Sequence, residues 1–79
     1  MRATVLVRPK PGILDPQGEA VLAALHHLDF AVGEVRIGRI VDIELEADTQ
    51  AQARAEVQRM CEQLLANPLI ESFAIELHE

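Results

Sequence analysis

The sequence predicts a single α+β domain, residues 1–79, in which a small antiparallel sheet carries two helices on one face. Three observations predict it. Apolar and polar residues alternate along two segments, apolar residues recur at helical spacing along two others, and the elements follow one another as strand, helix, strand, helix, strand. The chain contains no linker, repeat or low-complexity tract that would indicate a second domain.

The first strand is predicted over 3–8, and apolar or β-branched side chains on both of its faces are typical of a central strand. The Pro-Lys-Pro-Gly sequence of 9–12 ends it, since proline cannot donate to a sheet ladder and glycine permits a turn. The apolar pair Ile13 and Leu14 then follows the cation Lys10, a pattern that favours a loop for docking a partner.

A helix is predicted over about 16–28, followed by a turn over 29–33. Asp15 stands where an N-cap belongs, and Pro16 occupies the first helical position. Alanines on this helix should let it approach the sheet closely. The positions at helical spacing are Val21, Leu22, Leu25 and Leu28, with Ala20, Ala23 and Ala24 beside them.

The alternation from Val35 to Leu45 predicts a strand of about 13 residues over 34–46. At roughly 3.3 Å per residue it would span about 43 Å. A compact chain of this length has a radius of gyration of about 12 Å and a diameter of about 30 Å. We therefore expect the strand to bend sharply, to double back at Gly38, or to extend onto a second subunit and serve in dimerisation.

Arg39 is the one exception to this alternation, and Gly38 stands beside it on the polar face. Arg39 occupies a position whose strand neighbours are apolar, so it either extends its guanidinium to the sheet edge or pairs with a carboxylate or phosphate at an interface. Gly38 lacks a side chain and would let another backbone approach closely. An interface or ligand role for the pair stays open at this point.

The second helix begins at a capping box, Thr49 with Gln52. It should close near Ala66, because Pro68 disfavours a helical conformation in the residue before it. A last strand is predicted over 70–78. The order is βαβαβ, or βαββαβ if the long strand folds back, and both are typical of ferredoxin-like architecture. The apolar stripe of the second helix comprises Val57, Met60, Cys61 and Leu64.

Composition excludes several classes of function. A net charge of −6, with two Phe and no Trp or Tyr, argues against nucleic-acid binding. No apolar run is long enough to cross a membrane. The single cysteine, Cys61, excludes an internal disulfide and fits a reducing compartment, so we expect a cytoplasmic protein.

Residues with catalytic or metal-binding potential are explained by structural roles. His26 and His27 stand near a helix C-terminus, which favours positive charge. Cys61 lies on an apolar stripe and is predicted to be a core residue. Carboxylates at alternate positions of the long strand are typical of a solvated face, at Asp42, Glu44 and Glu46. We expect no catalytic, cofactor-binding or metal-ligating residue on this chain.

Three blocks of sequence resemble a known family: PKPGILDPQG at 9–18, VRIGR at 35–39 and CEQLLANPLIE at 61–71. Together they resemble PurS, the small subunit of phosphoribosylformylglycinamidine synthase, a purine-biosynthetic ligase, over essentially the whole chain. The sequence departs from the family pattern at three positions. Arg39 stands where lysine is expected, Asp29 where glycine is common, and Phe73 where tyrosine is usual.

The resemblance implies a non-catalytic subunit of an ATP-dependent amidoligase. It would form a homodimer or tetramer and bridge a glutaminase subunit and a large synthetase subunit, supporting ammonia transfer between them, with ATP and Mg on the synthetase. Candidate interface residues lie in two loops and at the start of the long strand: Lys10, Gly12, Ile13, Leu14, Arg36, Gly38, Arg39, Asn67, Pro68 and Glu71. The alternative is a dimeric ferredoxin-like regulatory domain that binds a small molecule.

Overall fold

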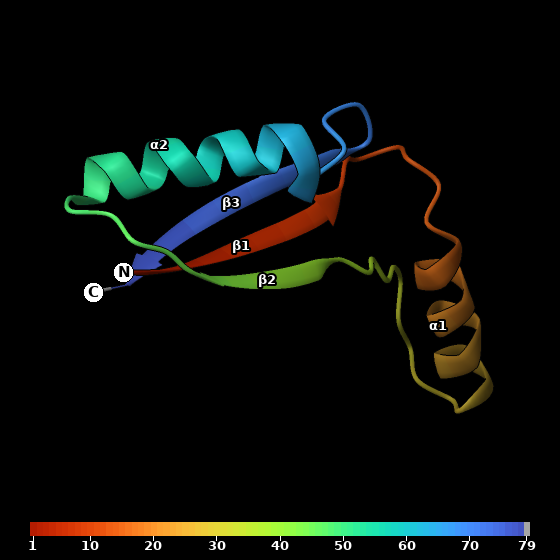
Figure 1. The fold of residues 1–79 in the computed structure, drawn as a ribbon. Helices are drawn as coiled ribbons and strands as arrows, with labels where there is room; N and C mark the ends of the chain where they lie inside the picture. Colours follow the sequence, from red (N-terminus) through yellow and green to blue (C-terminus); the bar gives the residue numbers. More distant parts are fainter. Residues whose placement is uncertain (79) are drawn as a thin grey trace.

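The structure is a computed structural model that describes residues 1–78. Within them, three antiparallel strands form one sheet in the order β2-β1-β3, with β1 in the centre as predicted (Figure 1). A π-helical turn, η1, directly continues the second helix. The elements are β1 (Arg2–Pro9), α1 (Pro16–His27), β2 (Arg39–Glu44), α2 (Gln50–Met60), η1 (Cys61–Leu65) and β3 (Glu71–His78).

The core lies between α2 and one face of the sheet. Every second residue of β1 points into it, and Ala3, Val5 and Val7 are at most 1% exposed. From the helical side, Val57 and Cys61 are fully buried against them. Cys61 is therefore a core residue, as predicted, and α2 with the sheet forms the body of the molecule.

α1 lies beyond the end of the sheet and packs on neither of its faces (Figure 1). The prediction that two helices share one face is therefore wrong, because only α2 packs there. The chain is consequently elongated, with extents of 50 × 25 × 14 Å and a radius of gyration of 15.8 Å, rather than compact as we expected. Irregular segments on both sides of α1 lead out from the sheet and back to it, which is what separates the helix from the body.

The predicted long strand is shorter than expected. β2 begins at Arg39, and 34–38 runs outside the sheet without reversing direction, so the hairpin at Gly38 and the βαββαβ order are wrong. The ladder ends there because Val7 is the last β1 residue that pairs with β2. Gly38 does permit a close backbone approach, as predicted, since a Cβ atom there would lie 2.2 Å from the Val7 carbonyl oxygen.

Both predicted helix starts are confirmed. The Asp15 side chain accepts a hydrogen bond from the Gly18 N–H (3.0 Å) at the start of α1. At α2, the Thr49 hydroxyl accepts from the Gln52 N–H (3.1 Å), while the Gln52 side chain accepts from the Asp48 N–H (3.2 Å). These local hydrogen bonds satisfy backbone donors that a helix leaves unpaired.

The predicted apolar stripe of the second helix is wrong at Leu64, which is 83% exposed. The cause is η1, in which the Ala66 N–H donates to the Cys61 carbonyl (3.1 Å), a step of five residues. The wider turn shifts the phase of the helix by about one residue, so that Leu65 and Ala66 pack against the core instead.

Candidate functional site

The ten candidate residues gather at one end of the sheet, where β1 ends and both β2 and β3 begin. Hydrogen bonds link the loop after β1, the segment before β2 and the turn before β3. The two loops predicted as separate contact regions therefore form one continuous surface, which we call the loop surface. Its members are Lys10, Gly12, Ile13, Leu14, Arg36, Gly38, Arg39, Asn67, Pro68 and Glu71.

Arg39 pairs with a carboxylate of its own chain. Its Nη1 lies 2.6 Å from Glu71 Oε2 and its Nη2 lies 3.1 Å from Glu71 Oε1, a bidentate pair. Nη2 also donates to the Leu65 carbonyl at the end of η1. Glu71 raises the pKa of Arg39, and Arg39 holds the pKa of Glu71 below its ordinary value. The unusual arginine position is therefore explained by a contact that joins β2, η1 and β3.

The turn over 67–71 is closed by Asn67. Its backbone N–H donates to Glu71 Oε1 (2.7 Å), and its carbonyl accepts from the N–H groups of Ile70 (3.1 Å) and Glu71 (2.7 Å). Its side-chain oxygen accepts from the Leu69 N–H (3.1 Å). An asparagine suits this position because its short amide oxygen bonds the backbone two residues on.

Lys10 ties the turn to the first loop. Its Nζ donates to the Pro68 carbonyl (2.6 Å), and its backbone N–H donates to the Ile70 carbonyl (2.8 Å). The Lys10 carbonyl in turn accepts from Arg36 Nη2 (2.9 Å) and from the Ile13 N–H (3.2 Å). Gly12, at φ +83°, makes the turn between these contacts, in a conformation that glycine adopts readily.

Sequence reasoning missed a second role of Asp15. Its Oδ2 accepts from the Ile37 N–H (2.7 Å), so one carboxylate both caps α1 and holds the segment before β2. The Ile37 N–H, followed by that of Gly18, lowers the pKa of Asp15. Gly18 is required for this contact, since a Cβ atom there would lie 2.3 Å from the Val35 carbonyl oxygen. The available signal was a glycine in the first turn of a helix, where it costs about 1 kcal/mol relative to alanine.

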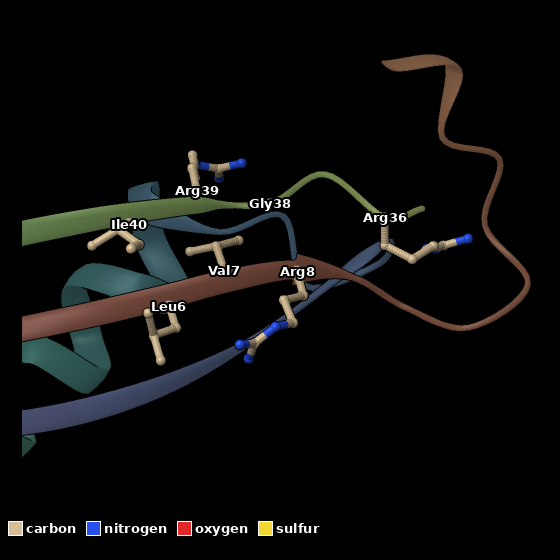
Figure 2. Close-up of a pocket in the computed structure, with 7 residues that line it drawn as sticks. All are labelled: Leu6, Val7, Arg8, Arg36, Gly38, Arg39 and Ile40. Atoms are coloured by element: carbon tan, nitrogen blue, oxygen red, sulfur yellow. The ribbon is translucent and has the colours of Figure 1, made fainter. Parts of the chain in front are cut away.

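Several cavities adjoin the loop surface, and two of them have both Gly38 and Arg39 in their linings. The first, of about 250 Å³, has apolar walls that include Ile13, Leu14, Ile37 and Ile70. The second, of about 480 Å³, lies on the sheet face opposite α2. Figure 2 shows that its arginine side chains, Arg8, Arg36 and Arg39, point in three different directions and do not converge on a common point. The second cavity therefore has no arrangement suited to a small anion.

Reactive side chains are engaged elsewhere in the fold. Burial raises the pKa of the Cys61 thiol, which opposes the thiolate form. His26 Nε2 lies 2.6 Å from the Val32 carbonyl, and Thr4 Oγ1 lies between Asp42 (2.8 Å) and His78 Nε2 (3.1 Å). Over residues 1–78, no group of three or more His, Cys, Asp or Glu side chains is placed to hold a metal ion. No helix in that range has the length and apolar character to span a membrane.

These observations define a class of protein: a small α+β chain whose distinctive residues organise a surface rather than a reaction centre. Comparison with known proteins identifies the family. Residues 2–79 match the family model described as PurS: phosphoribosylformylglycinamidine (FGAM) synthase. The chain belongs to the PurS family.

Individual relatives agree over their full lengths. The chain is 41% identical to the PurS subunit of phosphoribosylformylglycinamidine synthase from Archaeoglobus fulgidus, covering 100% of each chain. It is similar to the crystal structure of Bacillus subtilis PurS at a TM-score of 0.88 and 39% identity, covering 99% of this chain and 98% of the other. It also matches a chain of PurLQS from Thermotoga maritima at a TM-score of 0.86 and 28% identity, covering 95% and 93% of the two chains.

Proposed function

We propose that this chain is the small, non-catalytic subunit of a phosphoribosylformylglycinamidine synthase complex. The observation that carries the proposal is that the three segments resembling the PurS family meet at one loop surface. These segments are 9–18, 35–39 and 61–71. The most strongly bonded charged groups there, Arg39 and Glu71, are committed to each other. A surface whose charged residues maintain its shape is suited to docking another subunit, and the family assignment favours this role over small-molecule regulation.

In the proposed complex, chemistry takes place on the partners. A glutaminase subunit would release ammonia, and a large synthetase subunit would bind ATP and Mg²⁺ and use that ammonia on formylglycinamide ribonucleotide. The present chain would bridge these two subunits in the cytoplasm and support transfer of ammonia between them. A protected passage keeps a reactive intermediate from loss to solvent.

The proposal includes a homodimer that uses the β2 side of the molecule. β2 is an edge strand within the described sheet, and Ile40 on it is 65% exposed. The segment around Arg36 and Gly38 leads directly into this edge. Strand pairing with a second copy would satisfy the unpaired backbone groups along it. An elongated chain with a 50 Å axis gains more from such pairing than a compact one, because more of its surface is open.

The test is glutamine-dependent amidotransferase activity of the matching glutaminase and synthetase subunits, measured with and without this chain. Ammonia-dependent activity of the synthetase alone is the control. We expect glutamine-dependent turnover to require the chain and ammonia-dependent turnover to need it much less. Equal glutamine-dependent turnover in its absence, together with no complex in sedimentation, would refute the bridging role.

A further inference from the structure

The 250 Å³ cavity of the loop surface is made by segments far apart in the sequence. Ile13 and Leu14 come from the loop after β1, Ile37 from the segment before β2, and Ile70 from the turn before β3. Leu14 is 71% exposed and Ile70 is 42% exposed, so the apolar rim faces solvent. Water in contact with these side chains would be released on binding, which favours association with another apolar group.

Both carboxylates of the same cavity are already engaged in hydrogen bonds within the chain. Both oxygens of Asp15 accept backbone N–H groups, from Gly18 and Ile37. Both oxygens of Glu71 accept from Arg39, and one also accepts from the Asn67 N–H. A ligand that donates to these carboxylates would compete with these bonds, whereas an apolar group would leave them intact.

Size also limits the occupant. Cavities that hold cofactors or drug-sized ligands have volumes of roughly 300–1,000 Å³. At about 250 Å³ this one lies below that range and has the scale of a single large side chain. Anchor residues at protein interfaces are aliphatic or aromatic side chains inserted into pockets of this kind.

The charged residues beside the cavity indicate which kind of residue stands next to the anchor side chain in the partner. Lys10 flanks the lining, since its backbone N–H donates to the carbonyl of Ile70 (2.8 Å). Its Nζ is bonded to the neutral carbonyl of Pro68, and no carboxylate lies within ion-pairing distance of it among the described residues. Arg39 is 49% exposed and retains N–H groups beyond the three bonds that it makes. Arg39 and Glu71 neutralise each other, and Asp15 is held by backbone N–H groups, so Lys10 is the cation beside the cavity that no carboxylate of the described residues pairs with.

We propose that this cavity receives one aliphatic or aromatic side chain from a partner subunit, and that a carboxylate next to that side chain pairs with Lys10. The inference rests on the proposed function and specifies the part of the chain that meets the partner. An apolar anchor would bury the apolar walls of the cavity, and an acidic residue beside it would neutralise Lys10.

The experiment measures the affinity of the full chain for each purified matching subunit, glutaminase and synthetase, by biolayer interferometry. Leu14→Asp and Ile70→Asp place a charge on two independent walls of the cavity. Leu28→Asp, at a leucine that is 64% exposed at the C-terminal end of α1 and outside the cavity lining, is the matched control. Circular dichroism melting and light scattering check the fold and the solution mass of every variant.

We expect both wall variants to weaken binding of one subunit by at least about tenfold, and Leu28→Asp to change it by less than about threefold. Lys10→Ala should weaken the same interaction and reduce its dependence on salt, because a rim charge is screened by ions. Wild-type affinity in folded Leu14→Asp and Ile70→Asp overturns the cavity assignment alone.

Two further outcomes have distinct meanings. If the wall variants lower the solution mass of the isolated chain, a second copy occupies the cavity and the inference is wrong. If the wild-type chain binds neither subunit, the proposed function fails, and the cavity assignment fails with it.

Discussion

The body of the molecule and α1 are stabilised in different ways. In the body, apolar side chains such as Val5 and Val57 are fully buried. In α1 the buried residue is Gly18, while Val21 is 39% exposed. α1 is held by the hydrogen bonds that Asp15 accepts and by the contacts that close its C-terminal end. The difference teaches that two amphipathic helices of one small chain can contribute unequally to its stability, because burial and not periodicity stabilises a helix in a protein.

The largest effect should come from Val57→Ala in α2. Removing two methyl groups from a fully buried site leaves a cavity and should lower the free energy of unfolding by about 2 kcal/mol. The matched change Val21→Ala in α1 should cost less than about 1 kcal/mol. Urea unfolding followed by far-UV circular dichroism measures both, since the chain has no Trp or Tyr. Equal losses would show that α1 is as well packed as the body.

Gly18→Ala should separate α1 from the segment that returns to the sheet. The new Cβ would lie 2.3 Å from the Val35 carbonyl oxygen, so one of the two segments must move. Hydrogen exchange should become at least about tenfold faster in α1 while staying unchanged in α2. Gly33→Ala is the control, because no atom lies within 4 Å of a Cβ there. Unchanged exchange in the Gly18 variant would contradict the close contact.

Acidification should distinguish the Arg39–Glu71 pair from other charges. Glu71 has a pKa below its ordinary value of 4.5 in the folded chain, so its contribution is fully present above about pH 4.5. It is lost as the pH falls through the lowered folded pKa. In Glu71→Gln the melting temperature should therefore be lower at neutral pH and fall less steeply below about pH 4.5. Glu76→Gln, on the exposed face of β3, should keep the wild-type slope. A wild-type slope in the Glu71 variant would disprove the assignment.

The smallest effect should come from Asp29→Gly at the end of α1. Asp29 has φ +71°, and its N–H donates to the His26 carbonyl (3.0 Å) while the Phe30 N–H donates to the Leu25 carbonyl (3.0 Å), the pattern of a Schellman motif. Glycine adopts this conformation without strain, so stability should rise by up to about 1 kcal/mol. Thermal melting measures the change, and Asp29→Val should lower stability instead. A destabilising glycine would mean that the aspartate side chain contributes more than the strain costs.

Elements fixed by local chemistry were predictable from the sequence. Asp15 and Thr49 mark helix starts because their side chains cap nearby backbone groups, and that requires no knowledge of the rest of the fold. The ten residues of the loop surface were chosen as interface candidates from the strand length, the unusual position of Arg39 and the family resemblance, and that role stays a prediction. Their internal contacts were not predicted. The bond between Asp15 and Ile37 joins residues 22 positions apart, and no local pattern reports such a distance.

The incorrect predictions have a common physical cause. An alternating pattern reports that one side of a segment is covered, but not what covers it. Val35 and Ile37 are half-buried, as the alternation requires, yet they line cavities beside the loop after β1 and α1 instead of joining the sheet. The predicted burial of Leu64 is wrong for a related reason, because a single π-helical turn changes the phase of an otherwise regular pattern.

The buried position of Cys61 makes its thiol a probe of how often the body of the molecule opens. It is the sole thiol of the chain, and it is completely enclosed between α2 and the sheet. A colourless aromatic disulfide reagent can modify it only when the body opens, so the rate of colour release reports the frequency of that opening. Movements of α1 would leave the rate unchanged. An absorbance trace recorded on the unmodified protein can therefore measure the opening rate of the body alone. Opening of α1 would not contribute to the signal.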